Sequence, residues 1–228
     1  MKRHVPNFLT CCNLFCGCLG IVFLMEDRGI PAAYFVWAAC VFDFLDGFAA
    51  RVLKTTSAIG KELDSLADVV SFGVLPTLVM YSLIAESISS EIVPFIGFSI
   101  AIFSALRLAV FNVDETQSDS FKGLNTPANT IFITSLPLVR EEFGDWLYQP
   151  SILIIITLVF SLLLVSRIEF FAFKFKNYSW ADNRIRFIFL LLSALLLALF
   201  QVTGIPFIII MYILFSFGVR VYSGPSNS

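Results

Sequence analysis

Four aspartates form two close pairs in the stretch from Phe42 to Asp68 of an otherwise apolar chain. Asp43 and Asp46 are three residues apart, and Asp64 and Asp68 are four apart. Spacings of three and four place side chains on one face of a helix. Carboxylate oxygens are the ligands that hard divalent cations such as Mg²⁺ and Mn²⁺ prefer. Four carboxylates this close would be partly protonated, paired with Arg51, Lys54 and Lys61, or bound to metal ions. Two ions about 3.5–4 Å apart would suit four carboxylates and phosphoryl chemistry.

The helices that carry these aspartates are predicted to span a membrane. Hydrophobic residues make up 58% of the 228 residues, and the mean hydropathy is +0.87, whereas a soluble domain is roughly 45–50% apolar. The apolar residues come in long runs without alternation, which favours helices over a β-barrel. We therefore expect an all-α integral membrane protein, a bundle of about eight transmembrane helices.

The expected spans follow the apolar runs between polar connections. They are residues 7–25, 31–53, 61–84, 92–113, 127–139, 151–166, 187–200 and 206–221, followed by a short tail that we expect to be disordered. The first run is longer than the apolar region of a signal peptide, about 7–15 residues, so we expect it to be retained. Residues 171–228 then supply a cytoplasmic loop, two additional helices and the tail.

The basic residues predict an orientation. With a cytoplasmic N-terminus, twelve Lys and Arg residues fall on the cytoplasmic side and two, Arg28 and Arg140, fall outside. Because cytoplasmic loops carry the excess of Lys and Arg, we expect both termini and all four aspartates near the cytoplasmic face of the cell membrane. The basic, aromatic segment 167–186 reads as a cytoplasmic loop, with an interfacial amphipathic helix as the alternative.

Small and basic residues accompany the aspartates. Gly47, Ala50 and Gly60 lack bulk and would let a ligand approach the helices closely, although small residues in membrane helices also serve packing. Arg51 can bind a phosphate with two hydrogen bonds or can simply anchor the helix at the membrane surface. A ligand pocket facing the four carboxylates is therefore predicted.

The stretch from Asp43 to Asp68 reads D-x2-D-G-x2-A-R-x8-G-x3-D-x3-D, and it resembles the signature of the CDP-alcohol phosphotransferase family. Four further stretches, "PNFLTCCNLFCGCLGI", "SFGVLPTLVMY", "ALRLAVFNV" and "FKGLNTPAN", resemble the phosphatidylserine synthases of that family. Val110 and Asn125 stand where that group usually has Arg and Pro. Both positions lie where the acceptor alcohol would be chosen.

The resemblance implies a fold and a reaction. Residues 1–170 would form the catalytic core of about six helices. Serine would attack the lipid-side phosphorus of CDP-diacylglycerol, releasing CMP. Site roles implied by the resemblance are metal binding by Asp43, Asp46, Asp64 and Asp68, with Mg²⁺ or Mn²⁺ as the ions; proton abstraction by Asp68; and nucleotide binding by Gly47, Ala50 and Gly60, assisted by Arg51. Asn13, an amide in the first helix, would either bind the nucleotide or hydrogen-bond a neighbouring helix.

Polar residues near the same face are candidates for binding the acceptor or its phosphate. They are Arg107, Asn112, Lys122 and Asn125. Arg107 lies in an apolar helix, where a cation is normally paired or functional, so an ion pair with an aspartate is the alternative. Two other functions stay open: the same transfer to inositol phosphate or glycerol 3-phosphate, and a cation transporter. We expect contacts with membrane lipids, no nucleic acid, and a homodimer as one oligomeric state.

Overall fold

The computed structural model describes residues 4–55, 57–114, 121–170 and 179–223, and its elements are nearly all helical. In order they are α1 (Val5–Met25), α2 (Ala32–Leu53), α3 (Ala58–Asp68), a π-helical turn (Val69–Val74), α4 (Leu75–Ser87), a 3-10 turn (Val93–Phe98), α5 (Ser99–Val113), β1 (Phe121–Lys122), α6 (Thr126–Ser135), a 3-10 turn (Leu136–Val139), α7 (Arg140–Phe143), α8 (Pro150–Leu164), β2 (Glu169–Phe170), α9 (Trp180–Phe200), a 3-10 turn (Gln201–Thr203) and α10 (Gly204–Ser223). The predicted all-α class is confirmed apart from the short antiparallel pair of β1 and β2.

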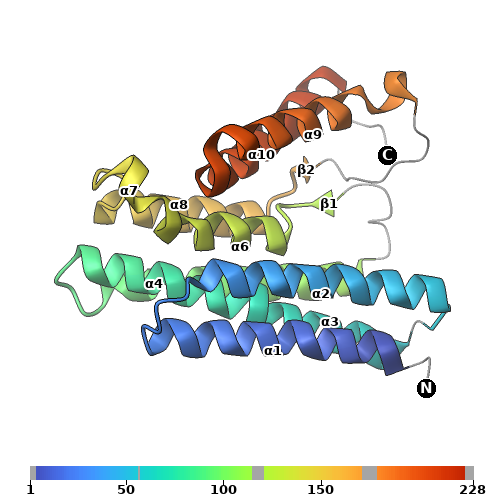
Figure 1. Cartoon of the computed structure of the whole chain (residues 1–228), viewed down its shortest axis with the longest axis horizontal. Coiled ribbons are helices and arrows are strands. Elements are labelled where there is room, and N and C mark those ends of the chain that lie inside the picture. The colour runs from blue at the N-terminus through green and yellow to red at the C-terminus, as the bar shows by residue number, and fades with distance from the viewer. Residues whose placement is uncertain (1–3, 56, 115–120, 171–178, 224–228) are drawn as a thin grey trace.

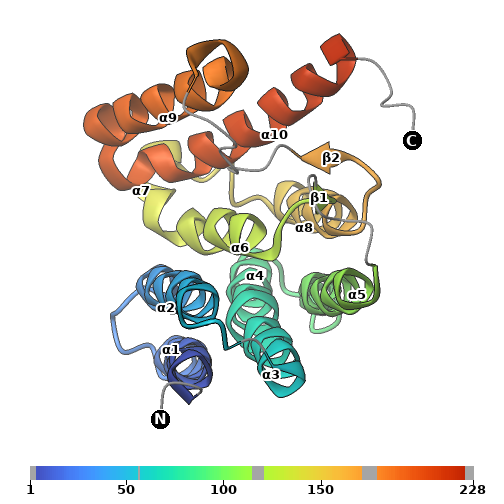
Figure 2. The same ribbon diagram turned by 90° about the vertical axis from the view of Figure 1, so that its right-hand side faces the viewer.

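In the first two thirds of the chain, α3 continues into α4 in one direction, and this stretch alternates in direction with α2 and α5, so the helix ends gather at two opposite ends of the bundle (Figure 1). One end collects the start of α1, the end of α2, the start of α3, the end of α5 and the start of α6. Helices α9 and α10 lie against the side of α6 and α8 that faces away from α1 and α3 (Figure 2). Residues that the sequence places far apart therefore meet at one end.

Within the described part of the chain, four helical stretches are long and apolar enough to cross a membrane: Val5–Met25, Ala58–Ser87, Val93–Val113 and Asn183–Gly218. Pro150–Leu164 is a shorter apolar helix. The last long stretch bends at Gln201, whose φ is 48°, so that α9 and α10 form a hairpin. Helix α9 begins at Trp180, earlier than the expected start at 187. Residues 115–120, 171–178 and 224–228, which include part of the expected basic loop and most of the tail, lie outside the described residues.

The π-helical turn joins α3 to α4 and packs closely against α1. A side chain at Gly17 would place its Cβ 2.4 Å from Ser71 Oγ and 2.9 Å from Ser71 Cα, so glycine allows this close approach. Ser71 Oγ donates to the carbonyl of Asn13 (3.0 Å), and Thr130 Oγ1 donates to the carbonyl of Phe72 (2.7 Å). The Ser71 hydroxyl thus ties the turn to α1, and the Thr130 hydroxyl ties it to α6. The sequence pattern did not predict this turn.

The strand pair closes the polar end of the bundle next to α8. The backbone N–H groups of Gly123 and Leu124 donate to the carbonyls of Ile168 (2.8 Å) and Leu163 (2.9 Å). Gly123 has a φ of 82°, and a Cβ there would lie 2.2 Å from the carbonyl oxygen of Leu164. Glycine is therefore required both for the conformation and for the approach to α8, which brings Lys122 beside the residues that follow α8.

Candidate active site

Three of the four aspartates come together between α2 and the end of α3. Carboxylate oxygens of Asp43, Asp64 and Asp68 all lie within 4.8 Å of one another. Asp68 is buried, and Asp43 and Asp64 are half-buried. Asp64 Oδ1 is buried and has no hydrogen-bond partner among the described residues. Three carboxylates at this separation repel one another strongly, so the arrangement calls for protons or a cation between them.

The fourth aspartate, Asp46, differs from the expected convergence of all four carboxylates. Its side chain is buried and accepts a hydrogen bond of 2.6 Å from Thr10 Oγ1 of α1. Asp43 and Asp46 are about 60° apart around α2, which turns Asp43 toward α3 and Asp46 toward α1. The hydrogen bond from Thr10 keeps Asp46 apart from the other three aspartates. The sequence pattern did not single out Thr10.

Asn13 of α1 contacts the acidic cluster directly. Its Nδ2 donates to Asp68 Oδ1 at 3.1 Å, and the residue is fully buried. Asn13 Oδ1 has no partner among the described residues. The residue expected at a nucleotide therefore lies beside the carboxylate that was expected to act as base.

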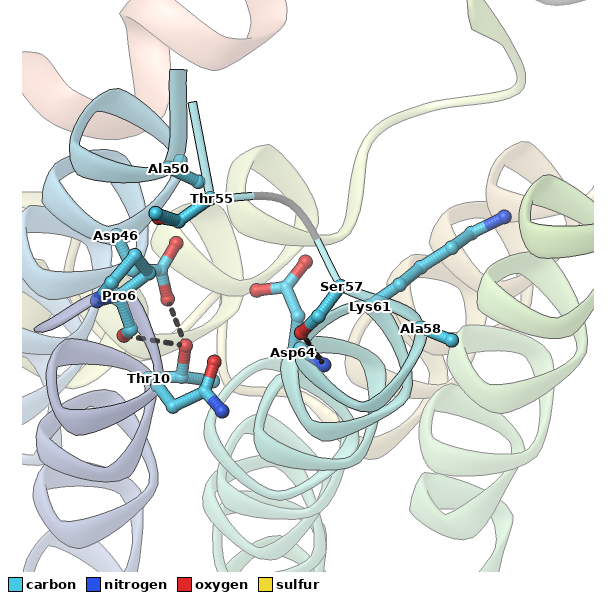
Figure 3. Close-up of a pocket in the computed structure, with 12 residues that line it drawn as sticks. Pro6, Thr10, Asp46, Ala50, Thr55, Ser57, Ala58, Lys61 and Asp64 are labelled. Atoms are coloured by element: carbon cyan, nitrogen blue, oxygen red, sulfur yellow. Dashed lines mark hydrogen bonds between the residues drawn. The ribbon is translucent and has the colours of Figure 1, made fainter. Parts of the chain in front are cut away.

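A cavity of about 510 Å³ opens beside Asp64 at the same end of the bundle (Figure 3). Its lining consists of Pro6, Asn7, Thr10, Asp46, Gly47, Ala50, Thr55, Ser57, Ala58, Gly60, Lys61 and Asp64. Figure 3 shows the carboxylates of Asp46 and Asp64 facing each other across it. A Cβ at Gly47 would have nothing within 4 Å, so the absence of a side chain there keeps the cavity open.

The expected nucleotide-binding residues thus divide into two groups. Gly47, Ala50 and Gly60 line this cavity. Arg51 is exposed in the last turn of α2 and does not belong to the described lining. Sequence reasoning missed Thr55, whose Oγ1 is buried without a partner among the described residues. Its place in the loop between two aspartate-bearing helices was the available signal.

A second cavity of about 210 Å³ lies between the end of α5 and the end of α8. Its lining consists of Arg107, Val110, Phe111, Asp114, Lys122, Leu164, Val165, Ser166 and Arg167. Arg107 and Lys122 were expected near an acceptor, and they do share this cavity. Asp114, Ser166 and Arg167 were not expected, because each directly follows an apolar run and reads as part of a solvated connection. Arg107 is half-buried, and its Nε has no partner among the described residues.

The two asparagines expected at the acceptor have their side chains engaged elsewhere. Asn125 caps α6, and its Oδ1 accepts from the backbone N–H of Ala128 (2.7 Å). Asn112 donates from Nδ2 to Ser65 Oγ of α3 (2.7 Å). Neither belongs to the described lining of the second cavity. Their positions in the structure favour roles in holding helices rather than in binding a ligand.

The acidic cluster fits a hard divalent cation. An ion bound at about 2.1 Å separates opposite ligand oxygens by about 4 Å, close to the span observed for Asp43, Asp64 and Asp68. All the donors are oxygens, and the unpartnered Asp64 Oδ1 is available to coordinate. Other hydrogen-bond donors at the cluster are few, and Asn13 is the one that contacts Asp68 among the described residues.

Fold and site together define a helical membrane protein that can hold a divalent cation beside a cavity at one end of its bundle. The family model of the CDP-alcohol phosphatidyltransferases matches residues 3–220. The chain therefore belongs to the CDP-alcohol phosphatidyltransferase family, membrane transferases of phospholipid biosynthesis for which CDP-diacylglycerol is the implied phosphatidyl donor.

Named relatives fall within this family. The chain is 36% identical over 176 residues to a CDP-diacylglycerol–serine O-phosphatidyltransferase of Bacillus subtilis, covering 75% of this chain and 92% of the relative. It is 34% identical over 177 residues to the enzyme of the same name from Helicobacter pylori, covering 74% and 72%. An archaetidylserine synthase of Methanothermobacter thermautotrophicus is 31% identical over 168 residues, covering 73% and 69%.

Proposed function

We propose that this protein transfers the phosphatidyl group of CDP-diacylglycerol to the hydroxyl of L-serine, giving phosphatidylserine and CMP. The choice of serine as acceptor is supported by the mixed charge of the second cavity. Arg107, Lys122 and Arg167 line it together with Asp114. Free serine carries a carboxylate and an ammonium group, so a cavity with both signs of charge complements it. The names of the relatives support the same acceptor.

The donor nucleotide is assigned to the larger cavity. The open surface at Gly47 lets the cytidine and diphosphate lie close to the backbone of α2. Thr55 Oγ1, which has no partner among the described residues, is available to the nucleotide. Arg51, exposed at the end of α2, can reach a phosphate from outside the cavity. The acyl chains remain in the bilayer.

The acidic cluster is the proposed metal site. Asp43, Asp64 and Asp68 would hold one Mg²⁺ or Mn²⁺, and Asp46, facing Asp64 across the cavity, would hold a second with it. The bound ions supply charge neutralisation for the diphosphate and for the departing CMP. The protein itself holds the carboxylate oxygens in place before the donor arrives. Thr10 donates a hydrogen bond to Asp46, and Asn13 donates one to Asp68.

Asp68 is the proposed general base. Asn13 donates to its Oδ1, which leaves Oδ2 as the oxygen that would accept a proton. Asp68 Oδ2 would take the hydroxyl proton as the serine oxygen bonds to the lipid-side phosphorus and the bond to the CMP oxygen breaks. A base must lie within hydrogen-bond reach of the proton that it removes, and a buried, held carboxylate meets that requirement better than a mobile one.

The membrane arrangement is part of the proposal. The eight expected spans would cross the membrane, with both termini and both cavities at the cytoplasmic face, an orientation that the distribution of Lys and Arg supports. Serine then enters from the cytoplasm and the donor from the inner leaflet. Residues 1–170 form the catalytic core, and α9 and α10 lie outside it. A homodimer stays a prediction.

An acceptor panel tests the proposal. The purified protein in lipid nanodiscs is given CDP-diacylglycerol, Mg²⁺ or Mn²⁺, and one of serine, inositol phosphate or glycerol 3-phosphate, and CMP and lipid product are measured. We expect product with serine alone. Turnover of either phosphorylated alcohol in place of serine would show that the acceptor is wrong. Metal-dependent ion flux without CMP would favour a transporter.

A further inference from the structure

Two hydrogen bonds link α3 to the last turn of α5, and a third within α3 connects their ends. Lys61 Nζ donates to the carbonyl oxygen of Asn112 (2.7 Å), and Asn112 Nδ2 donates to Ser65 Oγ (2.7 Å). Ser65 Oγ in turn is within 3.3 Å of the Lys61 carbonyl, to which it donates. We call Lys61, Ser65 and Asn112 the α3–α5 link.

The link joins the elements that form the two cavities. Lys61 lines the larger cavity, although its ammonium group points away from Asp64 (Figure 3). Ser65 directly follows Asp64 of the acidic cluster. Asn112 lies between Phe111 and Asp114, which line the second cavity. Movement of one end of the link would therefore change the separation between the acidic cluster and the second cavity.

Other contacts hold α5 farther from the two cavities. Ser99 and Ser161 share a hydrogen bond of 2.9 Å between the first turn of α5 and α8. At mid-helix, a Cβ at Gly73 would lie 3.4 Å from Ser104 Cβ, so α5 packs there on the π-helical turn. The end of α5 that carries Phe111 and Asp114 is tied to α3 by the α3–α5 link.

We propose that Asn112 and Ser65 are positioning residues for the transfer step. They hold the acceptor cavity at the separation from Asp64 and Asp68 at which the acceptor hydroxyl reaches the phosphorus. This proposal rests on the assignment of the second cavity to the acceptor. Because a misplacement of about 1 Å can cost roughly a hundredfold in rate, one hydrogen bond between helices can control turnover without touching a substrate.

The test separates positioning from binding by steady-state kinetics. Asn112→Ala and Ser65→Ala should each lower kcat by about tenfold or more, with the KM values for donor and acceptor changing less than about twofold. Because both substitutions break the same bond, the double variant should lose little more than either single one. An unchanged kcat with a raised acceptor KM would show that Asn112 binds the acceptor and would overturn the proposal.

Two further variants distinguish a positioning role from a general loss of helix packing. In Asn112→Asp the Ser65 hydroxyl can donate to the new carboxylate, so most of kcat should return, and Ser65→Ala should remove that rescue. Ser99→Ala breaks a comparable bond at the other end of α5 and should keep wild-type kcat. If Ser99→Ala lowered kcat as far as Asn112→Ala does, the effect would be one of helix packing, and the proposal would be wrong.

The acceptor panel keeps the two proposals distinguishable. All variants are assayed with whichever alcohol the wild type uses. A wild type that uses another alcohol, with kcat still lost in Asn112→Ala, would refute serine as acceptor and keep the positioning role. A wild type that uses serine, with full kcat in Asn112→Ala, would refute the positioning role alone.

Discussion

The side-chain amide of Asn13 donates to Asp68 Oδ1 across 3.1 Å, joining α1 to the acidic cluster at a fully buried position. The two residues are 55 positions apart in sequence. The bond fixes one oxygen of the proposed base. Helix α1 therefore contacts the acidic cluster although it carries no acidic residue in its described span.

Replacing Asn13 by Ala should slow turnover with little loss of substrate affinity. A hydrogen bond to a charged group contributes about 1.5–3 kcal/mol, so kcat should fall roughly tenfold to a hundredfold. Initial rates of CMP release at saturating donor and serine measure this. Ser71→Ala is the matched control, because Ser71 bonds the backbone carbonyl of Asn13 and not its side chain. A kcat within twofold of wild type in Asn13→Ala would contradict the positioning of Asp68.

Removing divalent metal should abolish transfer reversibly. EDTA should stop CMP release, and added Mg²⁺ or Mn²⁺ should restore it, because the carboxylates cannot neutralise a diphosphate without a cation. Binding can be followed separately by Mn²⁺ electron paramagnetic resonance. Asp43→Asn and Asp64→Asn should each weaken Mn²⁺ binding by about tenfold or more, since each removes a charged ligand from the site. Unchanged Mn²⁺ binding in both variants would refute the proposed metal site.

Two glycine substitutions should have opposite effects. A Cβ at Gly47 meets nothing within 4 Å, and Ala in a helix is favoured over Gly by roughly 0.5–1 kcal/mol. Gly47→Ala should therefore keep or raise thermal stability, while the KM for CDP-diacylglycerol rises because the methyl group enters the cavity. Gly17→Ala should lower thermal stability, since its Cβ would lie 2.9 Å from the Ser71 backbone. A destabilised Gly47→Ala would argue against an open cavity there.

Asp114 should control affinity for serine and not for the donor. If its carboxylate binds the serine ammonium group, Asp114→Asn should raise the KM for serine by about tenfold, as expected for loss of a charged hydrogen bond of about 1.4 kcal/mol. The KM for CDP-diacylglycerol should stay within about twofold. Ser161→Ala, in α8 outside the lining of the second cavity, serves as a control. An equal rise in both KM values would indicate a general distortion.

The ends of most helices could be predicted because polar connections interrupt the apolar runs. The expected spans 7–25, 31–53 and 151–166 lie within one or two residues of α1, α2 and α8. The π-helical turn in the third span could not be predicted, because it depends on contacts with distant helices: Ser71 of the turn donates to a carbonyl of α1, and Thr130 of α6 donates to a carbonyl of the turn. The strand pair likewise depends on the close approach of Gly123 to α8.

The candidate site was predicted in its chemistry and only partly in its geometry. The spacing of Asp64 and Asp68 placed both on one face of α3, and they do lie together. Asp43 and Asp46 have different neighbours, because Thr10 of α1 donates a hydrogen bond to Asp46. Asn112 and Asn125 were expected at the acceptor, yet their side chains tie α5 to α3 and cap α6.

The sequence by itself determined that this is a helical membrane protein with closely spaced carboxylates that could hold a divalent cation, because hydropathy and residue spacing act within single helices. The tertiary structure decided which carboxylates meet, which residues of α1 hold them, and that Asp114 and Arg167 share a cavity with Arg107. Spacing fixes angles around one helix axis. The rotation of one helix against another depends on packing between residues far apart in the chain, such as Gly17 on Ser71.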